Sequence, residues 1–228
     1  MKMRNIGINE YYHIYSRGTD KRLIFMDDSD KNRFTTLLYL ANGDSQTRIS
    51  NYFRTEQALG LLSLFEKDVG KPLVAIGAWC LMSNHIHLLV KEIEAGGISK
   101  FMARLLTAYS MYFNIKNNRT GALFESRFKA EHVNNDTYLK YLYCYIHLNP
   151  IKMIQSDWKT KGIFDAIQAE KFISAYPYSS LSEYKGEERI QAKILSRAIF
   201  PEYFETPESF DLFYKEWIDI KKQNEAKN

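Results

Sequence analysis

The sequence contains little cysteine and no hydrophobic run of transmembrane length. Its two cysteines, Cys80 and Cys144, stand far apart, each within an apolar stretch. This excludes a disulfide-rich secreted scaffold and predicts two buried, reduced thiols. The opening residues, MKMRNIGINEYY, lack the apolar core of a secretory signal. We therefore expect a soluble cytoplasmic protein with no membrane partner.

Internal repeats, low-complexity segments and a glycine-rich Walker loop are also missing. The chain has 228 residues, of which 45% are hydrophobic, so it can bury a sizeable core. Its net charge of +4 permits a polyanionic partner without requiring one.

Apolar periodicity predicts a series of alternating strands and helices. We predict strands over residues 11–16, 73–82, 85–91 and 128–133, the middle two joined as a hairpin through Ser83 and Asn84. Helices are predicted from the acidic capping residues 27–30 to about 42, over 98–116, and from a cap at Asp136 or Thr137 to 148. This order predicts an α+β fold, an antiparallel sheet with helices on one face.

The domain organisation follows from where these patterns weaken. We predict one domain over residues 1–187, with an insertion near 44–70 that contains a helix at about 56–67. Residues 188–228 are predicted to form a helical C-terminal extension, whose helix spans 201–228. That helix is rich in acidic residues, so we do not expect it to contact a polyanion.

Two histidines flank one isoleucine in the run Ser83-Asn84-His85-Ile86-His87. Alternate side chains of a strand point to one face, so His85 and His87 share a face. Two neighbouring imidazoles can hold a divalent metal. A strand with a solvated or hydrogen-bonded polar face is the plainer interpretation, and the motif alone favours it.

A second polar group lies at the end of the predicted helix 137–148. Tyr145 and Asn149 are four residues apart, so one helical turn brings them to one face. The amide oxygen of Asn149 can serve as a third metal ligand, and the phenol of Tyr145 can attack phosphorus once it loses its proton. However, Tyr145 also shares a stripe with Tyr138 and Tyr141, and such stripes more often pack into a core.

Taken in order, these segments resemble the single-tyrosine HUH transposases of insertion sequences, especially the REP-associated tyrosine transposases. Five segments within residues 11–185 carry most of the resemblance: His13-Ile14-Tyr15-Ser16-Arg17-Gly18, Trp79-Cys80-Leu81-Met82-Ser83-Asn84-His85-Ile86-His87, Arg127-Phe128-Lys129, Tyr145-Ile146-His147-Leu148-Asn149-Pro150-Ile151-Lys152 and Tyr176-Pro177-Tyr178-Ser179-Ser180. The stretch after about residue 188 has no counterpart in this pattern.

The resemblance implies a ferredoxin-like or RRM-like HUH nuclease core and a defined chemistry. It implies that His85, His87 and Asn149 hold a divalent metal, Mg²⁺ or Mn²⁺. It implies Tyr145 as the nucleophile, with Tyr143 as a less favoured alternative. The implied reaction cleaves single-stranded DNA, leaving a 5′-phosphotyrosine bond and a free 3′-hydroxyl, and rejoins it by the reverse attack. Hairpin-containing single-stranded DNA is the implied partner, and a homodimer is compatible with the family.

Basic residues predict contacts with the DNA backbone. Between Lys100 and Lys161, ten basic residues stand against four acidic ones, an excess suited to phosphate binding. An ordinary solvated surface is the alternative for each of them. The predicted contacts are Arg17, Lys21 and Arg22, in the loop after the first strand, with Arg127, Lys129 and Lys152.

Three other functions remain open. A DNA-binding protein of the same lineage, inactive or domesticated, would not need the histidines, the tyrosine and the asparagine together. An unrelated metal-dependent hydrolase would turn over without a covalent adduct. A ferredoxin-like RNA-binding domain would carry exposed aromatics on its sheet. Structural or hydrogen-bonding roles are predicted for His13, His132 and His147, and exposed strand-end positions for Glu92 and Glu94.

Overall fold

The computed structural model describes residues 6–55, 60–204 and 206–223. The first part of the helix predicted for residues 56–67, and the end of the one predicted for 201–228, lie outside the described residues. The described flanks of the predicted insertion form helix α2 (Ile49–Thr55) and a 3₁₀ segment, η2 (Leu61–Glu66).

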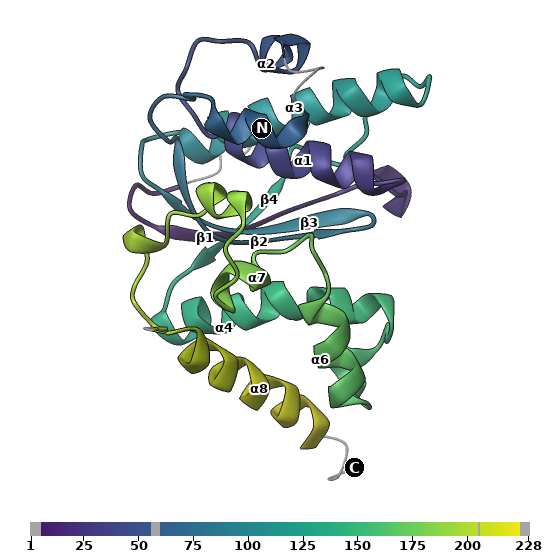
Figure 1. Cartoon of the computed structure of the whole chain (residues 1–228), viewed down its shortest axis with the longest axis vertical. Coiled ribbons are helices and arrows are strands. Elements are labelled where there is room, and N and C mark those ends of the chain that lie inside the picture. The colour runs from purple at the N-terminus through teal and green to yellow at the C-terminus, as the bar shows by residue number, and fades with distance from the viewer. Residues whose placement is uncertain (1–5, 56–59, 205, 224–228) are drawn as a thin grey trace.

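Four antiparallel strands form the central sheet, in the order β2-β3-β1-β4 (Figure 1). They are β1 (Tyr11–Arg17), β2 (Val74–Met82), β3 (His85–Glu92) and β4 (Lys129–Val133). β2 and β3 form the predicted hairpin, and β3 is an interior strand. The predicted α+β class, with an antiparallel sheet, is therefore confirmed.

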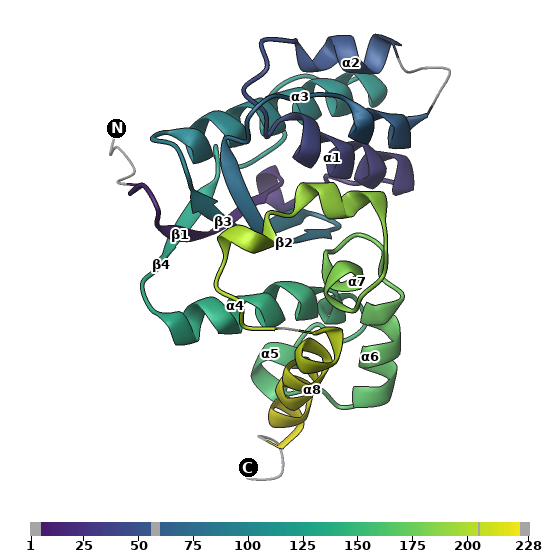
Figure 2. The same cartoon turned by 60° about the vertical axis from the view of Figure 1, so that its left-hand side comes forward.

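One face of the sheet is covered by α1 (Asp28–Leu40) and α3 (Gly97–Lys116), as Figures 1 and 2 show. α1 begins where predicted, because the Asp27 carboxylate accepts a hydrogen bond of 3.0 Å from the Asp30 amide. The rings of Phe25, Phe34 and Tyr109 pack together between these helices and the sheet.

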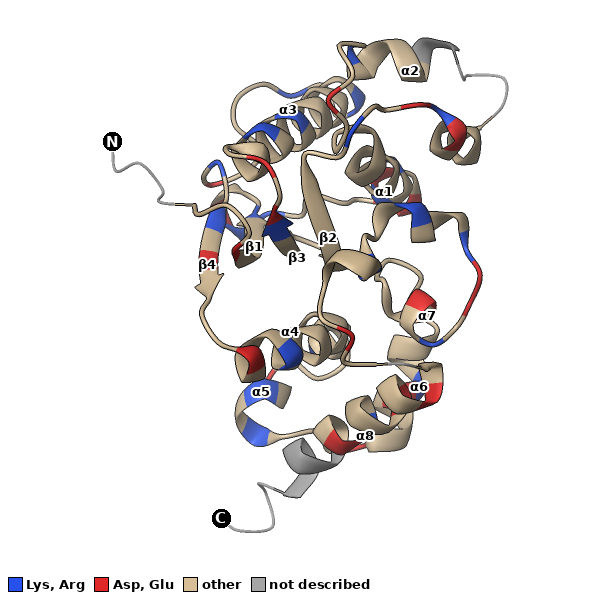
Figure 3. Ribbon diagram, turned by 90° about the vertical axis from the view of Figure 1, so that its left-hand side faces the viewer, with Lys and Arg blue, Asp and Glu red and all other residues tan. Residues whose placement is uncertain are grey.

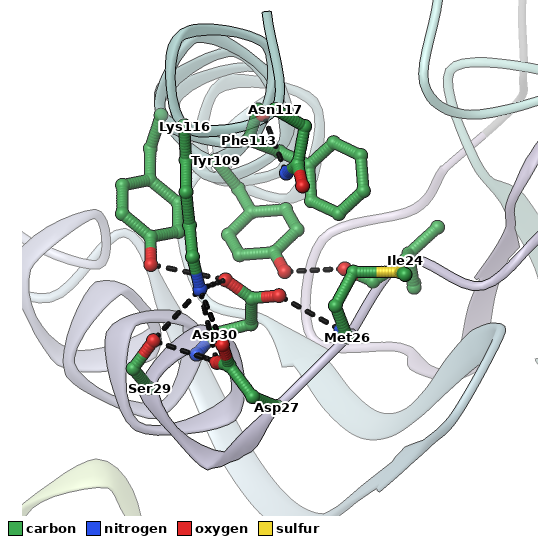
Figure 4. Close-up of polar contacts among 10 residues, drawn as sticks. Ile24, Met26, Asp27, Ser29, Asp30, Tyr109, Phe113, Lys116 and Asn117 are labelled. Atoms are coloured by element: carbon green, nitrogen blue, oxygen red, sulfur yellow. Dashed lines mark hydrogen bonds and ion pairs between the residues drawn. The ribbon is translucent and has the colours of Figure 1, made fainter.

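An ion cluster joins the start of α1 to the end of α3 (Figure 4). The Lys116 ammonium donates to Asp27 at 2.8 Å and to the fully buried Asp30 at 2.7 Å. Its hydrogen bond holds the pKa of Asp27 well below the ordinary range. Burial by itself would lower the pKa of Lys116, but the bonds to both carboxylates outweigh it and raise that pKa. The Tyr112 hydroxyl also donates to Asp30, so the cluster satisfies a buried carboxylate.

A second helical layer, beyond the one-face arrangement predicted from the sequence, covers the opposite face. α4 (Asp136–Leu148) packs there against β2 and β3, because β2 is buried along its whole length and needs cover on both sides. The cap of α4 is Asn135, not the predicted Asp136 or Thr137. Asn135 has extended backbone angles, and its side chain accepts from the Tyr138 amide at 2.7 Å.

In Figure 2, α5 (Trp158–Lys161), α6 (Ala166–Ser174) and α8 (Pro207–Gln223) lie below α4. The short helix α7 (Leu181–Tyr184) lies above them, nearer the sheet. The remaining short elements are 3₁₀ segments: η1 (Thr19–Lys21), η3 (Asn149–Met153), η4 (Ile190–Ile194) and η5 (Arg197–Ile199).

The C-terminal part of the chain also closes the outer edge of β2. The Leu81 amide donates to the Tyr178 carbonyl, and the Ser180 and Ser196 amides donate to carbonyls of β2. These bonds occupy an edge that could otherwise pair with another strand. Cys80 and Cys144 are both buried and free, as predicted. Within the described residues, none of the helices combines the length and apolarity needed to span a membrane.

Candidate active site

The sheet register gathers polar side chains on the face that α4 covers. Residues paired across antiparallel strands share a face. His87 lies opposite Tyr15, and His85 lies opposite Arg17. On the other side of β1, β4 continues the same rows. The group consists of His85 and His87 on β3, His13, Tyr15 and Arg17 on β1, and Lys129 and Glu131 on β4.

α4 brings Tyr145 to this group. Its ring meets His13 and His87 edge-on, with ring centroids 5.6 and 5.8 Å away. Asn149 follows one turn later at the C-cap, and its Nδ2 donates a 2.7 Å hydrogen bond to the Tyr145 carbonyl. That bond orients the amide oxygen of Asn149. Tyr145 and Asn149 thus share one face at the end of α4, as the helical spacing predicts, and packing brings both beside the histidine pair.

Hydrogen bonds fix the two histidine rings of β3. Nδ1 of His85 lies 2.6 Å from the Asn84 amide oxygen, which can only accept, so Nδ1 donates. Nδ1 of His87 lies 2.9 Å from Nε2 of His13, whose own Nδ1 faces the Glu131 carboxylate at 3.6 Å. The carboxylate favours the His13 tautomer that is protonated on Nδ1, so His13 Nε2 accepts a hydrogen bond from His87 Nδ1. Both rings of the pair then carry an unprotonated Nε2.

Burial keeps these imidazoles neutral. It lowers the pKa of His85 to about 3, with help from the nearby cations Arg17, Lys152 and Lys159. It lowers the pKa of His13 to about 4, although Glu131 opposes this shift. The pKa of His87 lies well below the ordinary value, because the ring is buried between two other imidazoles. The neutral ring is the form that binds metals.

Lys159 of α5 contacts the phenol directly. Its Nζ donates to the Tyr145 hydroxyl at 2.7 Å and lies 3.3 Å from the Asn149 amide oxygen. Burial and the nearby Arg17 lower the pKa of Lys159 to about 8, so the amine is mainly charged at neutral pH. Burial raises the pKa of Tyr145, and Glu131 raises it further, while Arg17 opposes. A charged Lys159 stabilises the phenolate and so offsets part of the rise in the Tyr145 pKa that burial causes.

The donor set of this site suits a divalent metal. Among the described residues, the hydrogen bonds of His85 and His87 engage Nδ1 and leave Nε2 without a partner. The amide oxygen of Asn149 adds a hard ligand of the kind Mg²⁺ and Mn²⁺ accept. No group of three or more His, Cys, Asp or Glu side chains in the described ranges is arranged to hold a metal. A metal here would therefore depend on the Asn149 amide.

These groups line a cavity of about 240 Å³. Three predicted DNA contacts line it: Arg17, Lys129 and Lys152. Figure 3 shows basic residues on both sides of the site, on β4 and on α5. The other three predicted contacts lie elsewhere. Arg127 lines a separate hollow beside α3, and Lys21 and Arg22 lie in the exposed loop after β1.

Sequence reasoning did not single out Lys159, Tyr15 or Glu131. The Tyr15 hydroxyl donates to Glu131 at 2.8 Å. Strand alternation could have grouped both with His13, because all three lie on one face of adjacent strands. Lys159 gives no such signal, since it comes from a four-residue helix whose approach to Tyr145 depends on packing.

The other candidate residues pack in the core or form hydrogen bonds outside the cavity. The alternative nucleophile, Tyr143, is 2% exposed and packs against Tyr184 and Phe204. Glu92 is fully buried rather than exposed as predicted, because both its carboxylate oxygens accept hydrogen bonds from backbone amides at the start of α3. His147 is fully buried, with Nε2 2.7 Å from the Ser180 hydroxyl. His132 bonds to Glu10.

Comparison with known proteins yields one family match and one structural match to report. Residues 46–149, which include the histidine pair, Tyr145 and Asn149, match the family model described as "Transposase IS200 like". The matched segment covers 104 of the 228 residues and falls in the family that the motifs resemble. A solved structure, "Structure of the REP associates tyrosine transposase bound to a REP hairpin", aligns at 12% identity over 84% of this chain and 89% of that one, with a TM-score of 0.45. No match was found among curated proteins.

Proposed function

We propose that this chain, whose residues 46–149 match the IS200-like transposase family model, cleaves and rejoins single-stranded DNA through Tyr145. One observation carries the proposal: Tyr145, the histidine pair and Asn149, which come from different elements, meet in a single cavity with a basic rim. A protein that only binds DNA needs no half-buried phenol beside two oriented imidazoles.

The proposed reaction transfers the scissile phosphate of the DNA to the Tyr145 oxygen. The Tyr145 oxygen loses its proton to solvent water and attacks a backbone phosphorus, and the bond from phosphorus to the 3′-oxygen breaks. The 3′-oxygen takes up a proton and leaves as a hydroxyl, while the 5′-phosphate stays on the tyrosine. Rejoining is the reverse attack by a 3′-hydroxyl. The covalent bond conserves the energy of the cleaved one, so no nucleotide is consumed.

The side chains of the cavity have distinct roles in this proposal. His85, His87 and Asn149 would hold Mg²⁺ or Mn²⁺, which when bound polarises the scissile phosphate and neutralises charge. The ammonium of Lys159 stabilises the phenolate of Tyr145 through the 2.7 Å bond. Three cationic side chains would bind backbone phosphates around the site: Arg17, Lys129 and Lys152.

A denaturing gel with labelled single-stranded DNAs, some containing hairpins, tests the proposal in Mg²⁺ or Mn²⁺. Wild-type protein is expected to retain label after denaturation, and Tyr145→Phe and His87→Ala are expected to lose it. Tyr143→Phe is the matched control on the same helix and should still form the adduct, since that ring lies in the core. Loss of the adduct in Tyr143→Phe but not in Tyr145→Phe would reassign the nucleophile.

Other results would favour the other functions. Metal-dependent cutting without an adduct, unchanged in Tyr145→Phe, would replace strand transfer by hydrolysis. Tight binding without cutting of any strand in the panel would favour an inactive DNA-binding protein. Selective binding of RNA would favour the RNA-binding fold, although the sheet face beside α4 presents imidazoles rather than a row of exposed aromatics.

A further inference from the structure

An aromatic hollow lies between the first half of α4 and α8, next to the candidate active site. Its volume is about 580 Å³, within the usual range of ligand pockets. Four of its lining residues are the rings of Tyr138, Tyr141, Phe213 and Trp217. The others are Asn135, Asp136, Thr137 and Lys140.

A row of rings connects this hollow to the nucleophile. The Tyr145 ring lies 5.7 Å from that of Tyr141, measured between centroids. Tyr141 in turn contacts Trp217 at 4.7 Å and lies nearly parallel to Tyr138 at 6.1 Å. The rings of Tyr138, Tyr141 and Trp217 are all half-buried, so part of each ring remains accessible to a ligand. A strand whose phosphate lies at Tyr145 would therefore meet this row within a short distance.

The charges around the hollow suit bases better than phosphates. Its only cation among the lining residues is Lys140, which lies over the Phe213 ring at 4.7 Å. Asp136 adds a negative charge on the rim and accepts a hydrogen bond from Tyr203. Backbone phosphates find their cations on the other side of Tyr145, at Arg17 and Lys129. A neutral, flat ligand with a π-face fits the rings, and every nucleobase has such a face.

We propose that the aromatic hollow stacks unpaired nucleobases of the strand that Tyr145 cleaves. This inference rests on the proposed function, which supplies the single-stranded substrate. It gives α8 a role in holding DNA by its bases, although the helix is rich in acidic residues. The base faces turn toward Trp217 and Tyr138, while the sugar–phosphate backbone stays toward the basic rim.

Trp217 supplies a direct readout. The chain has three tryptophans, and the other two, Trp79 and Trp158, are 0% and 2% exposed. Stacked bases should quench the fluorescence of Trp217 when oligothymidine is added to the full chain in a chelator, which prevents turnover. An abasic strand of equal length has the same phosphates but no bases, and should cause little quenching. In Trp217→Phe the quenching should disappear while the affinity is retained.

Affinity measurements complete the test. Trp217→Ala and Tyr138→Ala should each weaken binding of oligothymidine about 5- to 100-fold, without changing binding of the abasic strand. Leu212→Ala is the matched control, because Leu212 lies on α8 but is 65% exposed away from the hollow. It should bind both strands like the wild type.

Three results would overturn the inference. The first is wild-type affinity in Trp217→Ala with no quenching by oligothymidine. The second is equal loss in Trp217→Ala and Leu212→Ala, or equal loss for abasic and normal strands, which would mean that α8 only supports the fold. The third is self-association of wild-type protein that Trp217→Ala abolishes, without quenching by DNA, since a second copy would then fill the hollow. If the Tyr145 adduct still forms in any of these cases, the proposed function stands without the inference. Base-dependent quenching without an adduct would keep the hollow and remove the cleavage.

Discussion

Replacing Lys116 by methionine should destabilise the fold by leaving the Asp30 carboxylate buried without its cation. Asp30 is 0% exposed and, among the described residues, would retain as donors the Met26 amide at 2.8 Å and the Tyr112 hydroxyl at 3.0 Å. Removing one partner of a buried pair costs about 3–5 kcal/mol. Because the Lys116 side chain is 30% exposed, water can replace part of its contact, and we expect a loss of about 2–4 kcal/mol.

Thermal and urea denaturation, followed by circular dichroism, measure this loss. For a chain of this size the expected loss corresponds to a decrease in Tm of about 4–16 °C. Lys161→Met is the control, because its pair with Asp157 is exposed and should contribute little. Adding Asp30→Asn to Lys116→Met should restore part of the stability, since a neutral amide needs no cation.

The reasoning would be refuted if Lys116→Met lowered Tm no more than Lys161→Met does. It would also be refuted if the added Asp30→Asn lowered Tm further, because the Asp30 charge would then not be the source of the cost.

Three further predictions concern pH, the nucleophile and the basic rim. The free energy of unfolding should be at its full value above the ordinary histidine pKa and fall as the pH drops below it, because buried neutral imidazoles take up protons only on unfolding. At about pH 5 each such imidazole should lower the free energy of unfolding by about 2 kcal/mol. Urea denaturation measures this loss, and an unchanged urea midpoint would contradict it. The imidazoles with lowered pKa values are His13, His85, His87 and His147. Lys159→Met should slow adduct formation about 100-fold in single-turnover assays, with partial rescue in Lys159→Arg, and unchanged rates would remove Lys159 from the mechanism. Lys129→Ala should reduce the salt slope of single-stranded DNA binding by about 0.7, whereas Arg127→Ala, in a separate hollow, should leave it unchanged; equal effects would contradict the location of the basic rim.

Local patterns in the sequence were sufficient for the strands, the main helices and the pairs of polar side chains that share a face. The spacing of His85 and His87 places both on one face of any strand, whatever packs against it. Likewise, four residues separate Tyr145 from Asn149, which is one turn of any α-helix. Such relations hold within one element, because backbone geometry alone fixes them.

Neighbouring positions outside a regular element were less predictable. Arg127 and Lys129 stand two residues apart and would share a face within a strand. β4 begins only at Lys129, so Arg127 lies before the alternation starts and turns toward α3 instead. The second helical layer was also beyond local patterns, because an apolar strand does not show how many of its faces are covered by helices.

The sequence by itself determined the α+β fold class and the residues around which a site could form. Only the tertiary structure decided that Lys159 reaches the Tyr145 hydroxyl, that Glu131 orients His87 through His13, and that Trp217 lies against Tyr141. Each of these contacts joins segments that are distant in the chain or separated by irregular loops. Their positions follow from how the helices and strands pack against one another, and no local periodicity encodes that packing.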